Sequence, residues 1–219
     1  PTTGTLDRLD PYVTSSGQTL YSGVTLGQAT DSMVRETYRQ QLMRLVTADN
    51  GTRRAGVRLG GIFRSEPTVQ PNLFSMSVPI PSFMLYKSKE EIRSRPTVLF
   101  VGTHDGQLHA FRVDRSDTTP ESEYGRELWS YIPNDVLPQL QNLGTGAPLL
   151  MDASPAFGEV RLPRTDVLAD PTEEADNWRS VLVIGRGRNG QGYTALDVTD
   201  PTDPKLFWEI TPTQICVGD

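Results

Sequence analysis

The chain has 219 residues, of which 36% are hydrophobic and 22% charged, and its formal net charge is −6. This length suits one large β domain or two small ones, and the negative charge argues against a protein adapted to wrap nucleic acid. No apolar run approaches the roughly 20 residues that a membrane-spanning helix needs. Cys216 is the single cysteine, so any disulfide partner lies on another chain or on a segment outside this sequence.

Residues 1–57 are expected to form an irregular N-terminal segment that contains one helix, at about 31–48. Thr30 or Asp31 suits the start of this helix, and Asn50-Gly51 suits its end. Apolar side chains recur on one helical face and predict packing against the rest of the protein; they are Val34, Tyr38, Leu42 and Leu45 or Val46.

Two hairpins are predicted farther along the chain. The first joins the apolar run Val98–Val101 to Leu108–Phe111 through Asp105-Gly106, a dipeptide suited to the positive φ angles of a tight turn. The second joins Val181–Ile184 to Tyr193–Asp197 and has its turn at Asn189-Gly190. The offset between the copies grows from 83 residues at Val98/Val181 to 85 at Ala110/Ala195, so the second turn is two residues longer.

Each hairpin lies between two further landmarks that also recur. A Ser/Pro segment precedes it, at Ser65–Val69 and at Ser154–Phe157, and a Leu-x-Trp or Leu-Trp segment follows it, at Trp129 and Trp208. Four strands in this order are typical of one blade of a β-propeller. We therefore expect a mainly β fold: a first blade with inserts at 58–148 and a second at 149–219, with both tryptophans buried in matching positions.

The inserts are predicted from composition. Residues 70–85 mix prolines with large apolar side chains and are interpreted as an extended covering loop. The charged stretch Lys87–Arg95 suits a short helix that ends before Pro96, and 134–143 suits a second short helical segment. Because propellers typically close with about four to eight blades, two blades predict a portion of a longer protein, or one that docks on a partner supplying the missing faces.

The stretch Gly185-Arg186-Gly187-Arg188-Asn189-Gly190 has the Gly-x-Gly-x-x-Gly spacing of a dinucleotide-binding loop. Such a loop must lead into a helix whose N-terminal amides hold the pyrophosphate. Here it leads into Tyr193-Thr194-Ala195-Leu196-Asp197, which alternates as a strand does. The motif is therefore interpreted as a hairpin loop.

Other polar motifs give no catalytic, cofactor-binding or metal-binding residue. His104 and His109 are the only histidines, and we expect the first at the turn and the second on the following strand, where they need not converge on a metal. Asp197, Asp200 and Asp203 recur every third residue but lack the denser alternation of a calcium loop. Asn50-Gly51-Thr52 has the form of a glycosylation acceptor.

The sequence resembles the PilY/PilC family of type IV pilus tip and biogenesis factors over roughly Arg58 to Glu209. The motifs that carry the resemblance are Leu59-Gly60-Gly61-Ile62 with Ser65-x-Pro67, Arg95-Pro96 before Val98-Leu99-Phe100-Val101-Gly102, Asp105-Gly106-x-Leu108-His109-Ala110-Phe111, Glu127-Leu128-Trp129-x-Tyr131-Ile132-Pro133 and Gly192-Tyr193-x-Ala195-Leu196-Asp197-Val198-Thr199. A coarser part of this pattern resembles quinoprotein propellers in general.

The resemblance implies a non-enzymatic, secreted component at the pilus tip that acts in surface adhesion, helps pilus assembly and opposes retraction. Its implied partners are minor pilins, a host or abiotic surface, and the remaining blades of a longer chain. The family also implies Ca²⁺, held by an Asp-rich loop in the propeller, but no stretch of this sequence matches that loop.

Two other functions compete with the pilus tip. A quinoprotein dehydrogenase would use pyrroloquinoline quinone with Ca²⁺, and many such enzymes carry two adjacent cysteines that this chain lacks. A scaffold of another envelope assembly machine would carry no chemistry. Dye-linked alcohol oxidation after addition of the quinone and Ca²⁺ separates the enzyme from the other two.

Overall fold

The structure is a computed structural model, and it describes residues 59–73, 78–114, 120–136, 139, 150–162, 174–188 and 190–211. The helix expected at about 31–48, the Asn50-Gly51-Thr52 tripeptide and Cys216 lie outside these residues. Within the part of the chain that is described, no helix is long and apolar enough to cross a membrane.

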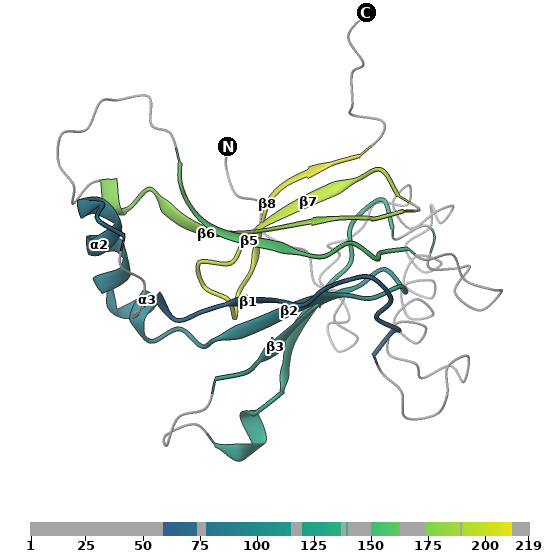
Figure 1. The fold of residues 1–219 in the computed structure, drawn as a ribbon, viewed down its shortest axis with the longest axis horizontal. Coiled ribbons are helices and arrows are strands. Elements are labelled where there is room, and N and C mark those ends of the chain that lie inside the picture. Colours follow the sequence, from purple (N-terminus) through teal and green to yellow (C-terminus); the bar gives the residue numbers. More distant parts are fainter. Residues whose placement is uncertain are drawn as a thin grey trace, which may run out of the picture.

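The described strands form two four-stranded antiparallel sheets, and in each sheet neighbouring strands follow one another in the sequence (Figure 1). Sheet 1 contains β1 (Thr68–Gln70), β2 (Val98–Gly102), β3 (Leu108–Arg112) and β4 (Glu127–Tyr131). Sheet 2 contains β5 (Ala156–Arg161), β6 (Trp178–Gly185), β7 (Tyr193–Asp197) and β8 (Lys205–Ile210). The predicted mainly β fold, with two successive four-stranded units, is confirmed at this level.

The two sheets repeat the same register. Ala110 lies opposite Trp129 in sheet 1, and Ala195 lies opposite Trp208 in sheet 2. Directly after each of these alanines the ladder shifts register, which is the mark of a β-bulge. The hairpin loops are 103–107 and 186–192, so the second is two residues longer, as the offsets predicted.

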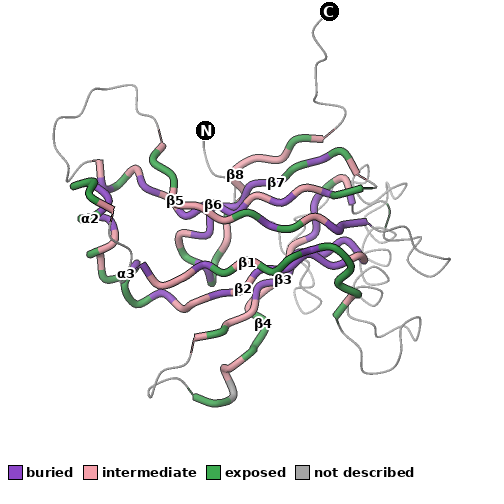
Figure 2. The backbone as a smooth tube through the Cα atoms, viewed as in Figure 1, coloured by how far each residue is buried: buried purple, intermediate pink, exposed green. Residues whose placement is uncertain are grey.

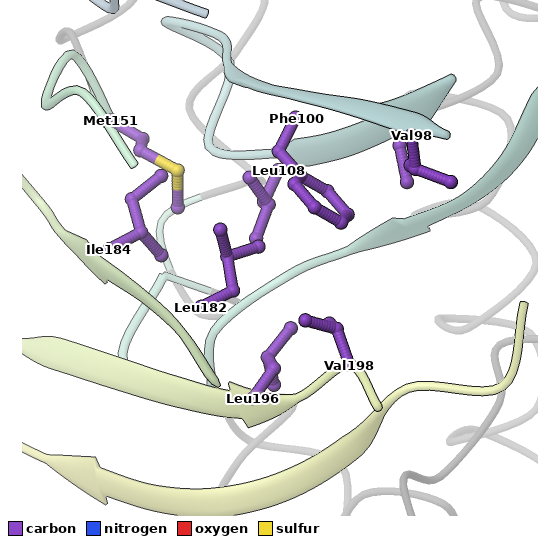
Figure 3. Close-up of a cluster of buried hydrophobic side chains, with 9 residues drawn as sticks. Val98, Phe100, Leu108, Met151, Leu182, Ile184, Leu196 and Val198 are labelled. Atoms are coloured by element: carbon purple, nitrogen blue, oxygen red, sulfur yellow. The ribbon is translucent and has the colours of Figure 1, made fainter. Parts of the chain in front are cut away.

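The apolar core lies between the sheets, which stack as two layers (Figures 1 and 3). Phe100 and Leu108 of sheet 1 contact the same cluster as Leu182 and Leu196 of sheet 2, and all four side chains are fully buried. Burial of one such side chain contributes about 1.5–3 kcal/mol. Figure 2 shows that buried residues follow the strands of both layers, so this interface is a principal core of the described chain.

A second, smaller core joins the inserts of the two units at one end of the layers. Helix α2 (Pro81–Ser88) and helix α3 (Glu90–Arg93) lie between β1 and β2. The ring of Phe83 packs 4.8 Å from that of Trp178, which begins β6 in the other sheet. The cluster consists of Leu73, Phe83, Tyr86, Ile92, Ala175 and Trp178.

The expectation of an extended loop through residue 85 is therefore wrong from Pro81 onward. Proline is favoured in the first turn of a helix, because the amide it lacks would have no intrahelical acceptor there, and α2 carries it at that position. The short helix expected at Lys87–Arg95 is the end of α2 together with α3. The segment expected to be helical at 134–143 is described only at 134–136, which form a turn, and at 139, which has 3-10 helical conformation.

Candidate functional site

The glycine-rich loop between β6 and β7 is a hairpin loop, as predicted. Its flanking residues Gly185 and Tyr193 pair directly across the ladder, and the chain continues as a strand, without the helix that a dinucleotide site requires. Gly187 has a positive φ of 79°, whereas Asn189, in the turn dipeptide that the sequence indicated, lies outside the described residues. A Cβ atom on Gly187 would lie 1.7 Å from Oδ1 of the buried Asp152, so this position excludes any side chain.

Arg186 begins this loop and is the centre of a polar cluster between the sheets. Its side chain is only 1% exposed. The Nη2 group donates to Oδ1 of Asp135 at 2.7 Å, to Oγ1 of Thr194 at 2.8 Å and to Oε1 of Glu209 at 3.0 Å. Glu209 also accepts from the Asn134 side chain, at 2.8 Å. The turn after β4 is thereby joined to β7 and β8 of the other sheet.

A second buried arginine occupies the opposite end of the interface. Arg95, just before β2, donates from Nη2 to Oε1 of Glu159 on β5 at 2.8 Å, and from Nη1 to Ser180 on β6 at 2.6 Å. The hydroxyl of Tyr86 lies 3.1 Å from Ser180 Oγ. Burial, with the negative charge of Glu159 as a second cause, raises the pKa of Tyr86 above its ordinary value. Sheet 1, sheet 2 and α2 meet at this cluster.

The two histidines lie where the sequence placed them and are held by structural contacts. His104 is in the turn after β2, and its backbone N–H donates to the Gly61 carbonyl at 2.9 Å. A Cβ atom on Gly61 would lie 2.4 Å from the His104 ring, and one on Gly60 would lie against the carboxylate of Asp105 at less than 3 Å. The pair Gly60-Gly61 is thus explained by the close approach of this segment to the turn.

His109 is buried on β3, and each of its ring nitrogens has a partner. The Nδ1 atom lies 2.5 Å from Glu127 Oε1 and the Nε2 atom 3.2 Å from Thr103 Oγ1. Thr103 in turn donates to the carboxylate of Asp105. These side-chain contacts stabilise the conformation of the β2–β3 turn.

The three aspartates at 197, 200 and 203 do not converge on one point. Asp197 accepts from the backbone N–H of Thr199 at 2.9 Å and pairs with Arg179 at 3.4 Å. Asp200 caps its own turn through the N–H and hydroxyl of Thr202. Among the described residues no group of three or more His, Cys, Asp or Glu side chains could hold a metal ion. These residues therefore do not fit the Ca²⁺ that the family resemblance implies.

Trp129 and Trp208 occupy matching positions, as expected, but both are half-buried and not buried as expected. The indole N–H of Trp129 donates to the carbonyl of Pro201, in the β7–β8 turn, at 2.8 Å. Trp129 also packs against Phe100, with ring centroids 5.7 Å apart. It thus joins sheet 1 to a turn of sheet 2.

The polar side chains described above therefore either stabilise turns within one sheet, as His109 does, or join the two sheets, as Arg95 and Arg186 do. Sequence patterns did not predict the two arginine clusters, since Arg95 and Arg186 meet carboxylates 64 and 51 residues away. A weak signal was present in both cases: each arginine adjoins a strand of a predicted hairpin. In the described part of the chain, Arg95 Nε and Arg186 Nη1 are buried without a hydrogen-bond partner.

No protein-family model matches the chain. The chain is 34% identical over 125 residues to "Type IV pilus biogenesis factor PilY1 homolog" of Xylella fastidiosa, which covers 56% of the chain and 9% of that protein. It is 30% identical over 196 residues to "Type IV pilus biogenesis factor PilY1" of Pseudomonas aeruginosa, which covers 85% of the chain and 14% of that protein. The chain belongs to the PilY1 family.

A second Pseudomonas aeruginosa PilY1 is 32% identical over 164 residues, 73% of the chain. The chain spans 9–14% of the length of these three PilY1 relatives. Among solved structures it is similar to the crystal structure of the Pseudomonas aeruginosa PilY1 C-terminal domain, with a TM-score of 0.40 and 26% identity, over 62% of this chain and 23% of that one. The family resemblance seen in the sequence motifs is confirmed by the relatives.

Proposed function

We propose that the chain is part of a type IV pilus biogenesis factor that acts, without catalysis, at the extracellular tip of the pilus in assembly and surface adhesion. The observation that carries the proposal is the 30–34% identity to proteins named as PilY1 pilus biogenesis factors. The proposed partners are minor pilins, a host or abiotic surface, and the rest of the longer polypeptide.

The contacts of the buried polar groups support a role without catalysis. Arg95, Arg186 and His109 are each engaged with carboxylates in contacts within or between the sheets. A catalytic site instead needs a nucleophile, an acid or a base directed at a space where substrate can bind. The described residues are therefore better suited to holding a rigid module in place.

We also propose that the two sheets are successive blades of a β-propeller, at 58–148 and 149–219. The packing of the two sheets supports this arrangement, because one face of sheet 1 packs against the opposite face of sheet 2. Sheet 1 buries the face of Phe100 and Ala110, whereas sheet 2 buries the face of Leu182 and Leu196. The alternation of side chains along a strand makes these opposite faces of the repeating unit. Identical units packed in this way continue into a ring when the rotation between neighbouring units closes.

Deletion of the segment from the natural full-length protein tests the pilus role. We expect fewer surface pili, measured as sheared pilin on immunoblots. If the segment opposes retraction, removal of the retraction motor restores the pili, whereas a defect in assembly persists. An unchanged amount of pili in both backgrounds contradicts the proposal.

Two controls separate the proposed activities. Adhesion is compared between strains matched for surface pili, so that loss of binding is not a consequence of fewer fibres. The purified protein is also incubated with pyrroloquinoline quinone, Ca²⁺ and an alcohol, and we expect no dye reduction. Dye reduction that requires the quinone would favour the dehydrogenase alternative.

A further inference from the structure

Two buried polar atoms at the Arg95 end of the interface have no hydrogen-bond partner among the described residues. One is Nε of Arg95, whose side chain is 2% exposed. The other is Oε1 of Gln70, the last residue of β1, which is 0% exposed. The first atom is a donor and the second an acceptor. A buried donor or acceptor without a partner destabilises the fold, so each of these atoms needs one.

The orientation of the Gln70 amide is fixed by its nitrogen. The Nε2 group donates to the backbone carbonyl of Val198 at 2.9 Å. A carbonyl can only accept, so exchange of the amide nitrogen and oxygen would place two acceptors against each other. The atom of Gln70 that lacks a partner is therefore the oxygen, and it needs a donor.

Both unpaired atoms belong to residues of one closed ring of contacts. Gln70 donates to the Val198 carbonyl, and the Val198 N–H donates to the Ser180 carbonyl at 2.8 Å. The Oγ atom of Ser180 accepts from Arg95 Nη1 at 2.6 Å. Arg95 Nη2 in turn lies 3.5 Å from the carbonyl of Pro71, the residue that follows Gln70. The ring thus returns to its start and contains both the unpaired donor and the unpaired acceptor.

The Pro71 carbonyl offers a third hydrogen-bonding position in this ring. Its contact with Arg95 Nη2, at 3.5 Å, is longer than the usual N–H···O hydrogen bond of about 2.7–3.2 Å, and a carbonyl oxygen can accept two hydrogen bonds. The ring therefore needs a group that accepts one hydrogen bond and donates two. Water does this, and buried waters typically make about three hydrogen bonds to otherwise unpaired polar groups.

We propose that this ring of contacts binds one internal water, which accepts from Arg95 Nε and donates to Gln70 Oε1 and to the Pro71 carbonyl. The water completes the hydrogen bonding of a charged side chain that lies buried between the sheets. It is then a fixed part of the interface, as buried waters that pair polar groups are. The site joins the end of β1 to the residue just before β2, at the point where Arg95 meets Glu159 of sheet 2.

A crystal structure of the natural full-length protein, at a resolution that shows ordered water, tests the proposal without any substitution. We expect one oxygen within about 3.2 Å of Arg95 Nε, of Gln70 Oε1 and of the Pro71 carbonyl. A direct hydrogen bond between Arg95 Nε and Gln70 Oε1 overturns the proposal. A partner supplied by another part of the chain, or no density at this position, also overturns it.

Paired substitutions give an independent measurement in solution, in the same full-length protein. Gln70→Met removes the amide, and Arg95→Lys removes Nε but keeps the positive charge beside Glu159. Either change removes a partner of the same water. The two changes together should therefore lower the melting temperature by less than the sum of their separate effects.

The control pair is Gln70→Met with Tyr86→Phe. The Tyr86 hydroxyl lies 3.1 Å from Ser180 Oγ, so it belongs to the same cluster but is not a partner of the proposed water. The effects of this pair should add. Additive effects of the Gln70 and Arg95 changes, or an equal departure from additivity in both pairs, overturn the proposal. Neither measurement depends on pili, so a failure here is distinct from a failure of the proposed pilus role.

Discussion

Arg186 places one positive charge among three oxygen-bearing side chains at the interface of the sheets. Asp135 and Glu209 both approach its guanidinium within 3.0 Å, and Glu209 is itself 8% exposed. Removal of one partner from a buried ion pair leaves the other charge without compensation, at a cost of about 3–5 kcal/mol. The contribution of Arg186 is therefore to neutralise carboxylates that β8 and the turn after β4 bring together.

The substitution Arg186→Met is expected to lower the free energy of unfolding by about 3–5 kcal/mol, because Asp135 and Glu209 keep their charges without the cation. Urea denaturation measures the change. Arg188→Met is the matched control in the same loop, since Arg188 is exposed, and it should change stability by less than about 0.5 kcal/mol. Equal effects of the two substitutions on stability would contradict the role of Arg186 in neutralising Asp135 and Glu209.

Tyr86 gives a prediction about alkaline pH. Its folded-state pKa is raised by burial and by Glu159, so the folded protein holds the phenolic proton more tightly than the unfolded chain does. The stability linked to this proton is present below the ordinary pKa of about 10 and is lost as the pH rises through the higher folded value. In Tyr86→Phe this loss is absent. The stability advantage of the wild type over Tyr86→Phe should therefore shrink between pH 9 and pH 11, and a constant difference would contradict the prediction.

At the scale of the secondary-structure elements, two turns each contain a glycine with positive φ. Gly106 has φ of 91°, and a Cβ atom there would lie 2.4 Å from Cγ1 of Val136. Gly125 has φ of 69°, but a Cβ atom there would meet nothing within 4 Å. The two glycines share the left-handed backbone and differ in the space around it.

Alanine substitutions at the two glycines separate backbone strain from steric exclusion. Gly125→Ala should cost about 1 kcal/mol, the strain of a side chain at positive φ. Gly106→Ala should cost about 1–3 kcal/mol more, because Val136 must also move. Thermal and urea denaturation of both variants give the comparison. A smaller cost at Gly106 than at Gly125 would show that the β2–β3 turn is not packed against Val136.

The sequence predicted the strands because their signals are local. Alternating β-branched and aromatic residues, Asp-Gly and the repeated tryptophans lie within a few residues of one another. Helix α2 was missed because its apolar residues do not form one stripe: Phe83 and Tyr86 are buried, whereas Met84 and Leu85 are exposed. The charge clusters were missed because the partners of Arg95 and Arg186 become neighbours only when the two sheets stack.

At the scale of the whole molecule, the repeat of one unit explains both what is buried and what is open. The side chains that the two units bury against each other, such as Phe100 and Leu182, are 0% exposed, whereas Tyr193 and Ile210 on the outer face of sheet 2 are 55% and 41% exposed. The covered interface also carries charged clusters at its two ends, at Arg95 and at Arg186, which fix the register of one sheet on the other. The apolar side chains thus fill the middle of the interface, and the buried charges lie at its two ends.

If the outer face of sheet 2 is open in the 219-residue chain, that chain should bind a hydrophobic dye. The double substitution Tyr193→Thr with Ile210→Thr should reduce the fluorescence of the bound dye and change stability little, because threonine suits strands and both side chains are exposed. The matched pair on the inner face is Leu196→Thr with Leu206→Thr. It should lower stability by more than about 2 kcal/mol, because it buries hydroxyls in the core and creates cavities there, and it should increase dye binding. If both pairs destabilise the chain equally, the outer face is already covered within these residues, and no further unit is needed to explain its apolar surface.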